Sequence, residues 1–408
     1  MHNILKTLFG ADAPARAATG PASPAQPIGE PAPASAVGEA FGPLVQCHAD
    51  RFTINGTGYP RRNLETRARP AFPRDLRTAL GGVFADDADA KALVPERSEI
   101  FLHITPGMAA ILGRIAELEQ HPRLKTFVML TGPTGCGKTT MVKTYCHFAN
   151  EPCVELTFSG DTTLADFFRR TEVVRAEGGQ STVAALGPAV RAMVFGHKLL
   201  INEINMLPPD LLSVLTQAMD TGRLVLAGTD LGNIAIAVHE RFGIFATANV
   251  NYVGTAEIGR ALHRRFGMGL GNIPMTFLPP AEEAAAVAFE FNRTPLFAGL
   301  DVHINPSIVD RVVGVANALR DHPDHGGQLR DRISTRSLVH WLTLARTTGL
   351  PLAEVAQRAV LATAPDDAYA PALELTRRAL GTATASVAYP EAFRRAVLGP
   401  DAPPEGAA

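Results

Sequence analysis

The stretch GPTGCGKT at residues 132–139 decides the fold, because it matches the phosphate-binding pattern GxxxxGK[ST] at every specified position. Before it, the apolar run TFVMLT at residues 126–131 predicts a buried strand. After it, KTTMVKTYCHFAN predicts a helix that begins at Lys138. In this order, the backbone N–H groups of the loop can surround phosphate oxygens at the positive end of the helix. The sequence therefore predicts a nucleoside triphosphate site in an α/β fold.

The residues expected to hold the nucleotide run through this loop into the helix. Lys138 is expected to reach the β- and γ-phosphates, and the Thr139 hydroxyl to hold Mg²⁺. The glycines allow the backbone to curl closely around the phosphates. The complete set is Gly132, Pro133, Thr134, Gly135, Cys136, Gly137, Lys138, Thr139 and Thr140.

The composition describes a globular protein with room for two or three domains. The chain has 408 residues, of which 46% are hydrophobic and 19% charged, and its formal net charge is −2. That charge gives no bulk attraction to nucleic acid. Cys47, Cys136, Cys146 and Cys153 have neither zinc-like nor disulfide-framework spacing, and no apolar run reaches the length of a membrane span. We therefore expect a cytoplasmic protein without membrane contact.

The sequence pattern also divides the chain into segments. Residues 1–44 are rich in Ala, Pro and Gly, which predicts a disordered tether, and residues 45–95 have no clear period and predict a small accessory segment. Residues 96–277 alternate apolar strands with amphipathic helices, as a parallel sheet flanked by helices demands. Residues 278–400 are helical in pattern and predict a small all-α lid domain, and residues 401–408 predict a disordered tail.

A second part of the site is predicted in HKLLINEIN at residues 197–205, a buried strand that ends in Asn202 and Glu203. An acid at the tip of this strand can polarise the water that attacks the γ-phosphate, which is the role expected of Glu203. The residue before it is ordinarily an Asp that fixes Mg²⁺, and Asn202 replaces that Asp with an uncharged amide. We therefore expect weaker Mg²⁺ binding or slower hydrolysis than an Asp would give.

The next predicted strand, FGIFATAN at residues 242–249, ends in Asn249, where a polar side chain can bridge the attacking water and the γ-phosphate. Soon after it, IGRALHRRF presents Arg260, Arg264 and Arg265. The fixed fork of donors on arginine suits the developing phosphoryl charge, and such a side chain can be supplied to a neighbouring subunit. Arg264 and Arg265 are both candidates for this role.

Together these motifs resemble the AAA+ ATPases, and more narrowly the MoxR-like group, which includes the CbbQ and NorQ activators and the ATPase subunit of cobaltochelatase. The resemblance covers about residues 95–370. Three stretches are similar to the narrower group. Its helix-2 insertion and the approach to Walker B resemble FSGDTTLADFFRRTEVV and GGQSTVAALGPAVRAMVFGHKLL, and its DEIN run resembles NEINMLPPDLLSVLTQAMDTGRL. The hairpin that the group carries before sensor 1 resembles LVLAGTDLGNIAIAVHERFGIFATAN. The resemblance implies a P-loop AAA+ sheet followed by a helical lid.

The resemblance also assigns roles to individual residues. It makes Asn249 sensor 1, Arg265 the leading arginine-finger candidate and Arg336, in RISTRSLVHW, sensor 2. Taken alone, the segment around Arg336 fits a solvated surface charge as well as it fits a residue that touches the nucleotide. The stretch HRRF has Arg264 where an acidic residue is more usual, so the choice between Arg264 and Arg265 stays open.

The function implied by the resemblance is that of a homo-oligomer, a hexameric ring that hydrolyses ATP with Mg²⁺ and remodels or activates a client protein. A protein with a von Willebrand factor A domain is one candidate client. Within the insertion, Leu164, Phe167 and Phe168 either line the pore of the ring or form one face of a short helix packed on the core.

Two other functions compete with the chaperone-like motor. A nucleic-acid motor or loader is opposed by the near-neutral charge and by the lack of an aromatic and basic strip. An ATP-gated structural subunit with little turnover is suggested by Asn202 and opposed by Glu203 and the arginines. The sequence alone identifies neither the client nor the ring size.

Overall fold

Five parallel strands form the central sheet, in the order β13-β5-β12-β9-β6. The strands are β5 Phe127–Gly132, β6 Cys153–Thr157, β9 Lys198–Asn202, β12 Gly243–Asn249 and β13 Asn272–Pro274. The computed structural model describes residues 39–40, 43–64, 90–120, 127–157, 169–176, 179–207, 209–229, 232–249, 266, 271–293, 304–321, 329, 333–362 and 364–383. The predicted fold class, a parallel P-loop sheet flanked by helices and followed by a helical region, is confirmed.

Alternate side chains of these strands enter two separate hydrophobic cores. On β5, Val128 and Leu130 pack in the core of α3 (Pro106–Gln120) and α4 (Lys138–Ala149). Met129, between them, packs in the core of α6 (Pro188–Phe195) and α7 (Pro209–Thr221). Both faces of the sheet are therefore buried, which explains why its strands read as continuous apolar runs in the sequence.

The register of the sheet brings the ends of its strands together at one edge. Asn249, the last residue of β12, is paired with Gly132, the last residue of β5. Asn202, the last residue of β9, is paired with Thr157 of β6. Because ligands of open α/β sheets bind at the carboxyl ends of the strands, this edge is where a site is expected.

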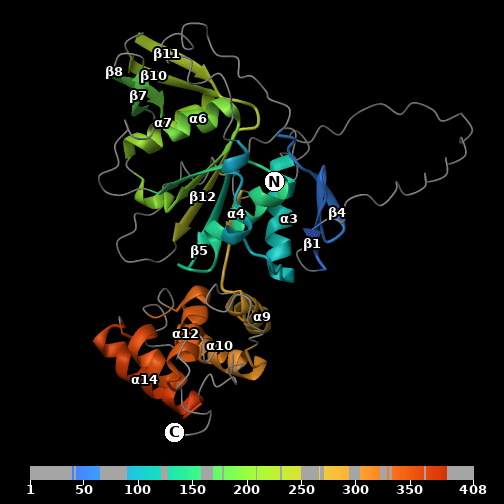
Figure 1. Cartoon of the computed structure of the whole chain (residues 1–408), viewed down its shortest axis with the longest axis vertical. Coiled ribbons are helices and arrows are strands. Elements are labelled where there is room, and N and C mark those ends of the chain that lie inside the picture. The colour runs from blue at the N-terminus through green and yellow to red at the C-terminus, as the bar shows by residue number, and fades with distance from the viewer. Residues whose placement is uncertain are drawn as a thin grey trace, which may run out of the picture. The chain divides into compact units, whose positions relative to one another are not determined.

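A small antiparallel sheet precedes the central one in the chain and lies beside α3 (Figure 1). Its strands are β1 Glu39–Ala40, β2 Val45–Cys47, β3 Arg51–Ile54 and β4 Thr57–Pro60. The sequence showed no clear period here, but the Asn55-Gly56 pair, with φ of 50° and 80°, makes the tight turn between β3 and β4. The buried Phe52 ring packs edge-to-face against Tyr145 and at a tilt against Phe148 of α4, with ring centroids 6.3 Å away in both cases.

Two antiparallel hairpins interrupt the alternation of strands and helices. The first pairs β7 (Arg169–Ala176) with β8 (Gly179–Leu186), within the segment that resembles the helix-2 insertion. The second pairs β10 (Arg223–Thr229) with β11 (Gly232–Ala237), as expected for the two strands around the TDLGN turn. Figure 1 shows both hairpins close to α6 and α7. Leu164, Phe167 and Phe168 lie outside the described residues.

The C-terminal helices surround a third core, which is built around Trp341 and includes Phe291 and Leu338. They are α9 Pro280–Asn292, α10 Pro306–Arg320, α12 Thr335–Thr348, α13 Leu352–Val355, the π-helical turn Ala356–Val360 and α14 Asp366–Leu380. Arg320 is fully buried and makes two hydrogen bonds to Glu283, of 2.7 and 3.0 Å. Its guanidinium also lies over the Phe277 ring, 3.8 Å from the centroid.

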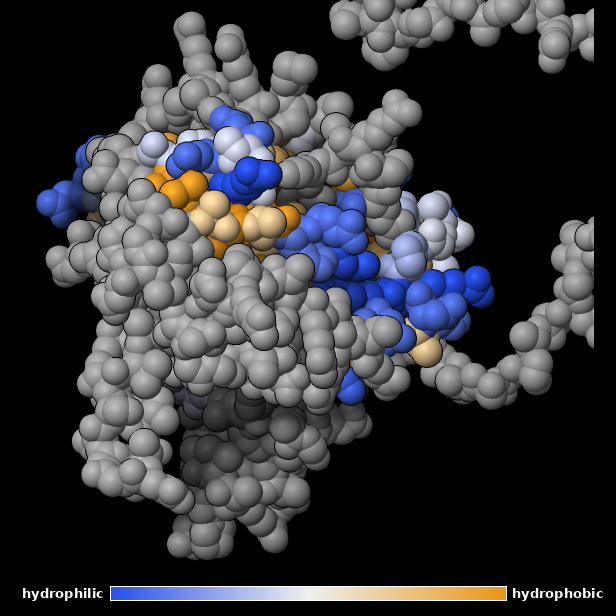
Figure 2. All heavy atoms as spheres, turned by 90° about the horizontal axis from the view of Figure 1, so that it is seen from above, coloured by the Kyte–Doolittle hydropathy of each residue, from blue (hydrophilic) through white to orange (hydrophobic). Residues whose placement is uncertain are grey.

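Among the described residues, the exposed large apolar side chains are Met206 and Val225. Figure 2 shows the described surface from above, where an apolar area adjoins a larger hydrophilic one. Within the described ranges, no helix combines the length and apolar character needed to cross a membrane.

Candidate functional site

The phosphate loop has the conformation that its glycines predict. Gly135 and Gly137 have φ of 76° and 92°, values that a residue with a Cβ adopts only at a cost. Gly137 is the N-cap of α4, so the helix begins at Lys138 as the sequence predicts. Gly132 ends β5, and Pro133, Thr134 and Cys136 complete the loop between strand and helix.

The Lys138 ammonium lies at the centre of the site. It is buried, with 7% of the residue exposed. Its Nζ donates to the carbonyl oxygens of Pro133 at 2.6 Å and Gly132 at 3.1 Å, and to Asn249 Oδ1 at 2.8 Å. These three acceptors are neutral oxygens of the loop and of β12, and an ammonium group in a phosphate-binding loop suits an anionic ligand.

Thr139, in the first turn of α4, meets Asn202 at the end of β9. The Thr139 hydroxyl donates to Asn202 Oδ1 at 2.8 Å, and the buried Thr247 hydroxyl lies 3.4 Å from the same oxygen. The structure thus brings together the two residues that the sequence predicts as the Mg²⁺ site. Their hydroxyl and amide oxygens are of the hard type that Mg²⁺ prefers.

Glu203 is held next to Asn249 at the same edge. Asn249 Nδ2 donates to Glu203 Oε1 at 3.2 Å, and the Glu203 backbone N–H donates to Thr247 Oγ1 at 3.1 Å. Glu203 has φ of 52°, in the left-handed region that a Glu rarely occupies. Such backbone strain is concentrated at functional sites, and the Glu203 carboxylate at this position is exposed.

One acidic residue beside this group was missed in the sequence. Glu155 of β6 accepts from Asn202 Nδ2 at 2.6 Å and forms an ion pair with Lys143 of α4 at 2.6 Å. Lys143 also pairs with Glu99 at 2.9 Å, and this hydrogen bond lowers the pKa of the Glu99 carboxyl. Burial opposes the charge on Lys143, but hydrogen bonds to Glu155 and Glu99 outweigh it and raise the pKa of Lys143. The available signal was an acid between the apolar residues Val154 and Leu156 of the strand CVELT.

The helical region meets the phosphate loop through the start of α12. Ser334, the N-cap of α12, lies so close to Gly135 that a Cβ on Gly135 would be 2.2 Å from Ser334 Cβ. Arg336, two residues further, has an exposed side chain at the first turn of the same helix. Arg264 and Arg265, the arginine-finger candidates, lie outside the described residues, as does Arg260.

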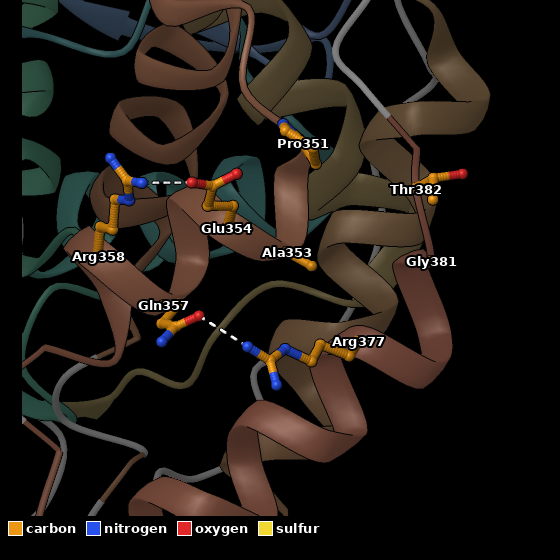
Figure 3. A pocket seen from close by; sticks show the side chains of 8 residues that line it. All are labelled: Pro351, Ala353, Glu354, Gln357, Arg358, Arg377, Gly381 and Thr382. Carbon is orange, nitrogen blue, oxygen red and sulfur yellow. Dashed lines mark hydrogen bonds and ion pairs between the residues drawn. The ribbon is translucent and has the colours of Figure 1, made fainter.

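A separate cavity of about 520 Å³ lies among the C-terminal helices (Figure 3). Arg358 pairs with Glu354 at its wall, and Arg377 donates to Gln357 at 3.0 Å. None of its lining residues belongs to the phosphate loop or to the strand ends. Among the described residues, no cluster of three or more His, Cys, Asp and Glu could hold a metal ion by itself.

Two protein-family models match this chain. Residues 127–266 match the AAA domain of the dynein-related subfamily, and residues 301–378 match the C-terminal region of CbbQ, NirQ and NorQ. The first match includes the phosphate loop, Asn202, Glu203 and Asn249, and the second includes Arg336.

The chain is also similar to several uncharacterised bacterial proteins. A Staphylococcus epidermidis protein is 35% identical over 145 residues, which are 35% of this chain and 54% of the relative. YojN of Bacillus subtilis is 34% identical over 140 residues, which are 34% of this chain and 45% of YojN. The chain thus spans about half the length of the curated relatives that it matches.

Among solved structures, NtrX from Brucella abortus in complex with ATP aligns with a TM-score of 0.38 and 17% sequence identity, covering 62% of this chain and 59% of NtrX. The two family matches agree with the phosphate loop and with the parallel sheet that carries it. The chain therefore belongs to the AAA+ ATPases, as a member of their MoxR-like group.

Proposed function

We propose that this chain binds ATP with Mg²⁺ and hydrolyses the γ-phosphate. The observation that carries the proposal is the convergence of Lys138, Thr139, Asn202, Glu203 and Asn249 at one edge of the sheet through hydrogen bonds of 2.8 to 3.2 Å. A cation, a hydroxyl, two amides and a carboxylate are the groups that phosphoryl transfer to water requires.

Each residue has a distinct role in this proposal. The loop amides and Lys138 bind the phosphates, where charged phosphate oxygens would replace the neutral oxygens that now accept from Nζ. Thr139 and Asn202 would hold Mg²⁺, which neutralises phosphate charge when bound. Asn249 orients the attacking water, and the Glu203 carboxylate accepts a proton from it.

Nucleotide binding is tested by replacing Lys138. In Lys138→Met the methylene stem remains but the charge is lost, so ATP affinity should fall by about tenfold or more. Calorimetric titration of the wild type and the variant with ATP and Mg²⁺ measures this. Equal affinities would contradict the assignment of the phosphate site.

We further propose that the chain works as a hexameric ring, in the manner of its group, in which Arg264 or Arg265 reaches the nucleotide of the neighbouring subunit. The AAA family match, which ends at residue 266 just after these arginines, supports this proposal. If it holds, specific ATPase activity rises with protein concentration, and an Arg265→Ala subunit lowers the activity of wild-type subunits mixed with it. Activity per subunit that is independent of concentration would contradict it.

The work done by this ring is proposed to be the remodelling or activation of a client protein. The match of residues 301–378 to the C-terminal region of CbbQ, NirQ and NorQ supports this function over a nucleic-acid motor, and the net charge of −2 points the same way. A protein with a von Willebrand factor A domain is the first client to test. A DNA mobility shift with a steep salt dependence would instead favour the nucleic-acid motor.

A further inference from the structure

Glu155 is an acid next to the predicted Mg²⁺ site for which the proposed mechanism has no role. It lies on β6, and its two carboxylate oxygens have different partners. Oε1 accepts from Asn202 Nδ2 at 2.6 Å, and Oε2 pairs with Lys143 Nζ at 2.6 Å. The contact with Asn202 joins it directly to the position where Walker B strands ordinarily carry an Asp.

The contact with Glu155 decides which atom of Asn202 faces Thr139. An ionised carboxylate can only accept hydrogen bonds, so the NH₂ group of Asn202 must face Glu155. The amide oxygen then points the other way, toward the Thr139 hydroxyl at 2.8 Å. Without this constraint, the two ends of the amide are similar in size and either could face Thr139. An NH₂ group on that side would repel a cation rather than attract it.

Glu155 also restores charge to this part of the site. Asn202 lacks the negative charge of an Asp, but the Glu155 carboxylate lies one hydrogen bond behind it. A hydrogen bond to an anion polarises the amide and makes its oxygen a stronger acceptor. The acid is thus displaced from β9 to the neighbouring strand β6, with the amide between it and Thr139.

We propose that Glu155 is a positioning residue, which fixes and polarises the Asn202 amide so that Oδ1 serves Mg²⁺ in place of an aspartate. This inference rests on the proposed function of the site. The competing explanation is that Glu155 only forms a partly exposed ion pair with Lys143. Glu99 provides the matched control, because it pairs with the same Lys143 at 2.9 Å and has no hydrogen bond to Asn202 among its described contacts.

The test is a double-mutant cycle between positions 155 and 202, read by binding rather than turnover. For each variant, affinity for ATPγS, a slowly hydrolysed analogue, is titrated in Mg²⁺ and in EDTA, and the ratio gives the enhancement by Mg²⁺. In Glu155→Gln, Lys143 competes for the single remaining oxygen, so we expect the enhancement to fall by about three- to tenfold with unchanged affinity in EDTA. Glu99→Gln should match the wild type.

The Asn202→Asp background distinguishes the two explanations. There the Asp carries its own charge and needs no oriented amide, so Glu155→Gln should change the enhancement by less than about twofold. In the absence of nucleotide, Asn202→Asp alone should lower the melting temperature, because it places two carboxylates at hydrogen-bonding distance, and adding Glu155→Gln should restore it.

An equal effect of Glu155→Gln in both backgrounds, or none in either, would overturn the proposal. Both outcomes leave the Mg²⁺ enhancement of the wild type intact, and hence the proposed function. A wild type whose ATPγS affinity does not depend on Mg²⁺ would overturn the Mg²⁺ site itself and the role of Glu155 with it.

Discussion

Ser334 leaves no room for a side chain on Gly135. A Cβ built on Gly135 would lie 2.2 Å from Ser334 Cβ and 2.9 Å from Ser334 Oγ. Ser334 caps α12, and its hydroxyl and that of Ser337 close the first turn of that helix. The phosphate loop and the first turn of α12 are therefore in direct contact.

We expect Gly135→Ala to lower ATP affinity by about tenfold or more, because the new methyl group meets Ser334 and the φ of 76° strains any residue with a Cβ. Calorimetric titration with ATP measures this. Gly113→Ala is the matched control, since Gly113 lies within α3 and a Cβ there meets no atom within 4 Å. The control should bind ATP normally and be as stable as the wild type or more so. Normal ATP binding by Gly135→Ala would contradict the close approach of Ser334 to Gly135.

The buried ion pair between Arg320 and Glu283 is predicted to be important for the stability of the helical region. Arg320→Met leaves the Glu283 carboxylate, which is fully buried, without its cation, and should cost about 3–5 kcal/mol of unfolding free energy. Chemical denaturation measures the cost. Arg358→Ala removes the exposed partner of Glu354 and should cost less than about 1 kcal/mol. Similar losses of unfolding free energy in Arg320→Met and Arg358→Ala would contradict the prediction that the buried ion pair matters more than the exposed one.

Glu151 should make the unfolding free energy of the protein fall at acid pH. Burial alone would raise the pKa of its carboxyl, but Lys198, Arg241 and Arg62 outweigh burial and lower that pKa. Because the folded pKa lies below the unfolded one, the contribution to stability is complete above the unfolded pKa and is lost as pH falls through the folded pKa. Between about pH 5 and pH 3, the wild type should therefore lose more unfolding free energy than Glu151→Gln does. Equal losses of unfolding free energy in the wild type and in Glu151→Gln would contradict the contribution of the Glu151 carboxylate.

The parts of the site that lie within one motif were predictable from the sequence. The loop at residues 132–139, its strand and its helix are adjacent in the chain, so their pattern also gives their geometry. Asn202, Glu203 and Asn249 follow from buried strands that end at one edge of a parallel sheet.

The contacts between distant segments could not be predicted in this way. Glu155 reaches Asn202 because β6 and β9 are neighbouring strands of the sheet. The periodicity of a single segment predicts a strand but not which strand lies beside it. Ser334 meets Gly135 through the packing of a separate helical region. The strands of the N-terminal sheet are two to four residues long, too short for an alternating pattern to be distinguished from a loop.

The central claim is that Glu203 accepts the proton of the water that attacks bound ATP. Its most direct test is phosphate release by the wild type and by Glu203→Gln, both saturated with ATP and Mg²⁺, with nucleotide affinity measured in parallel. We predict that Glu203→Gln retains ATP affinity within about threefold and loses activity by about a hundredfold or more. Unchanged phosphate release in Glu203→Gln would contradict the account.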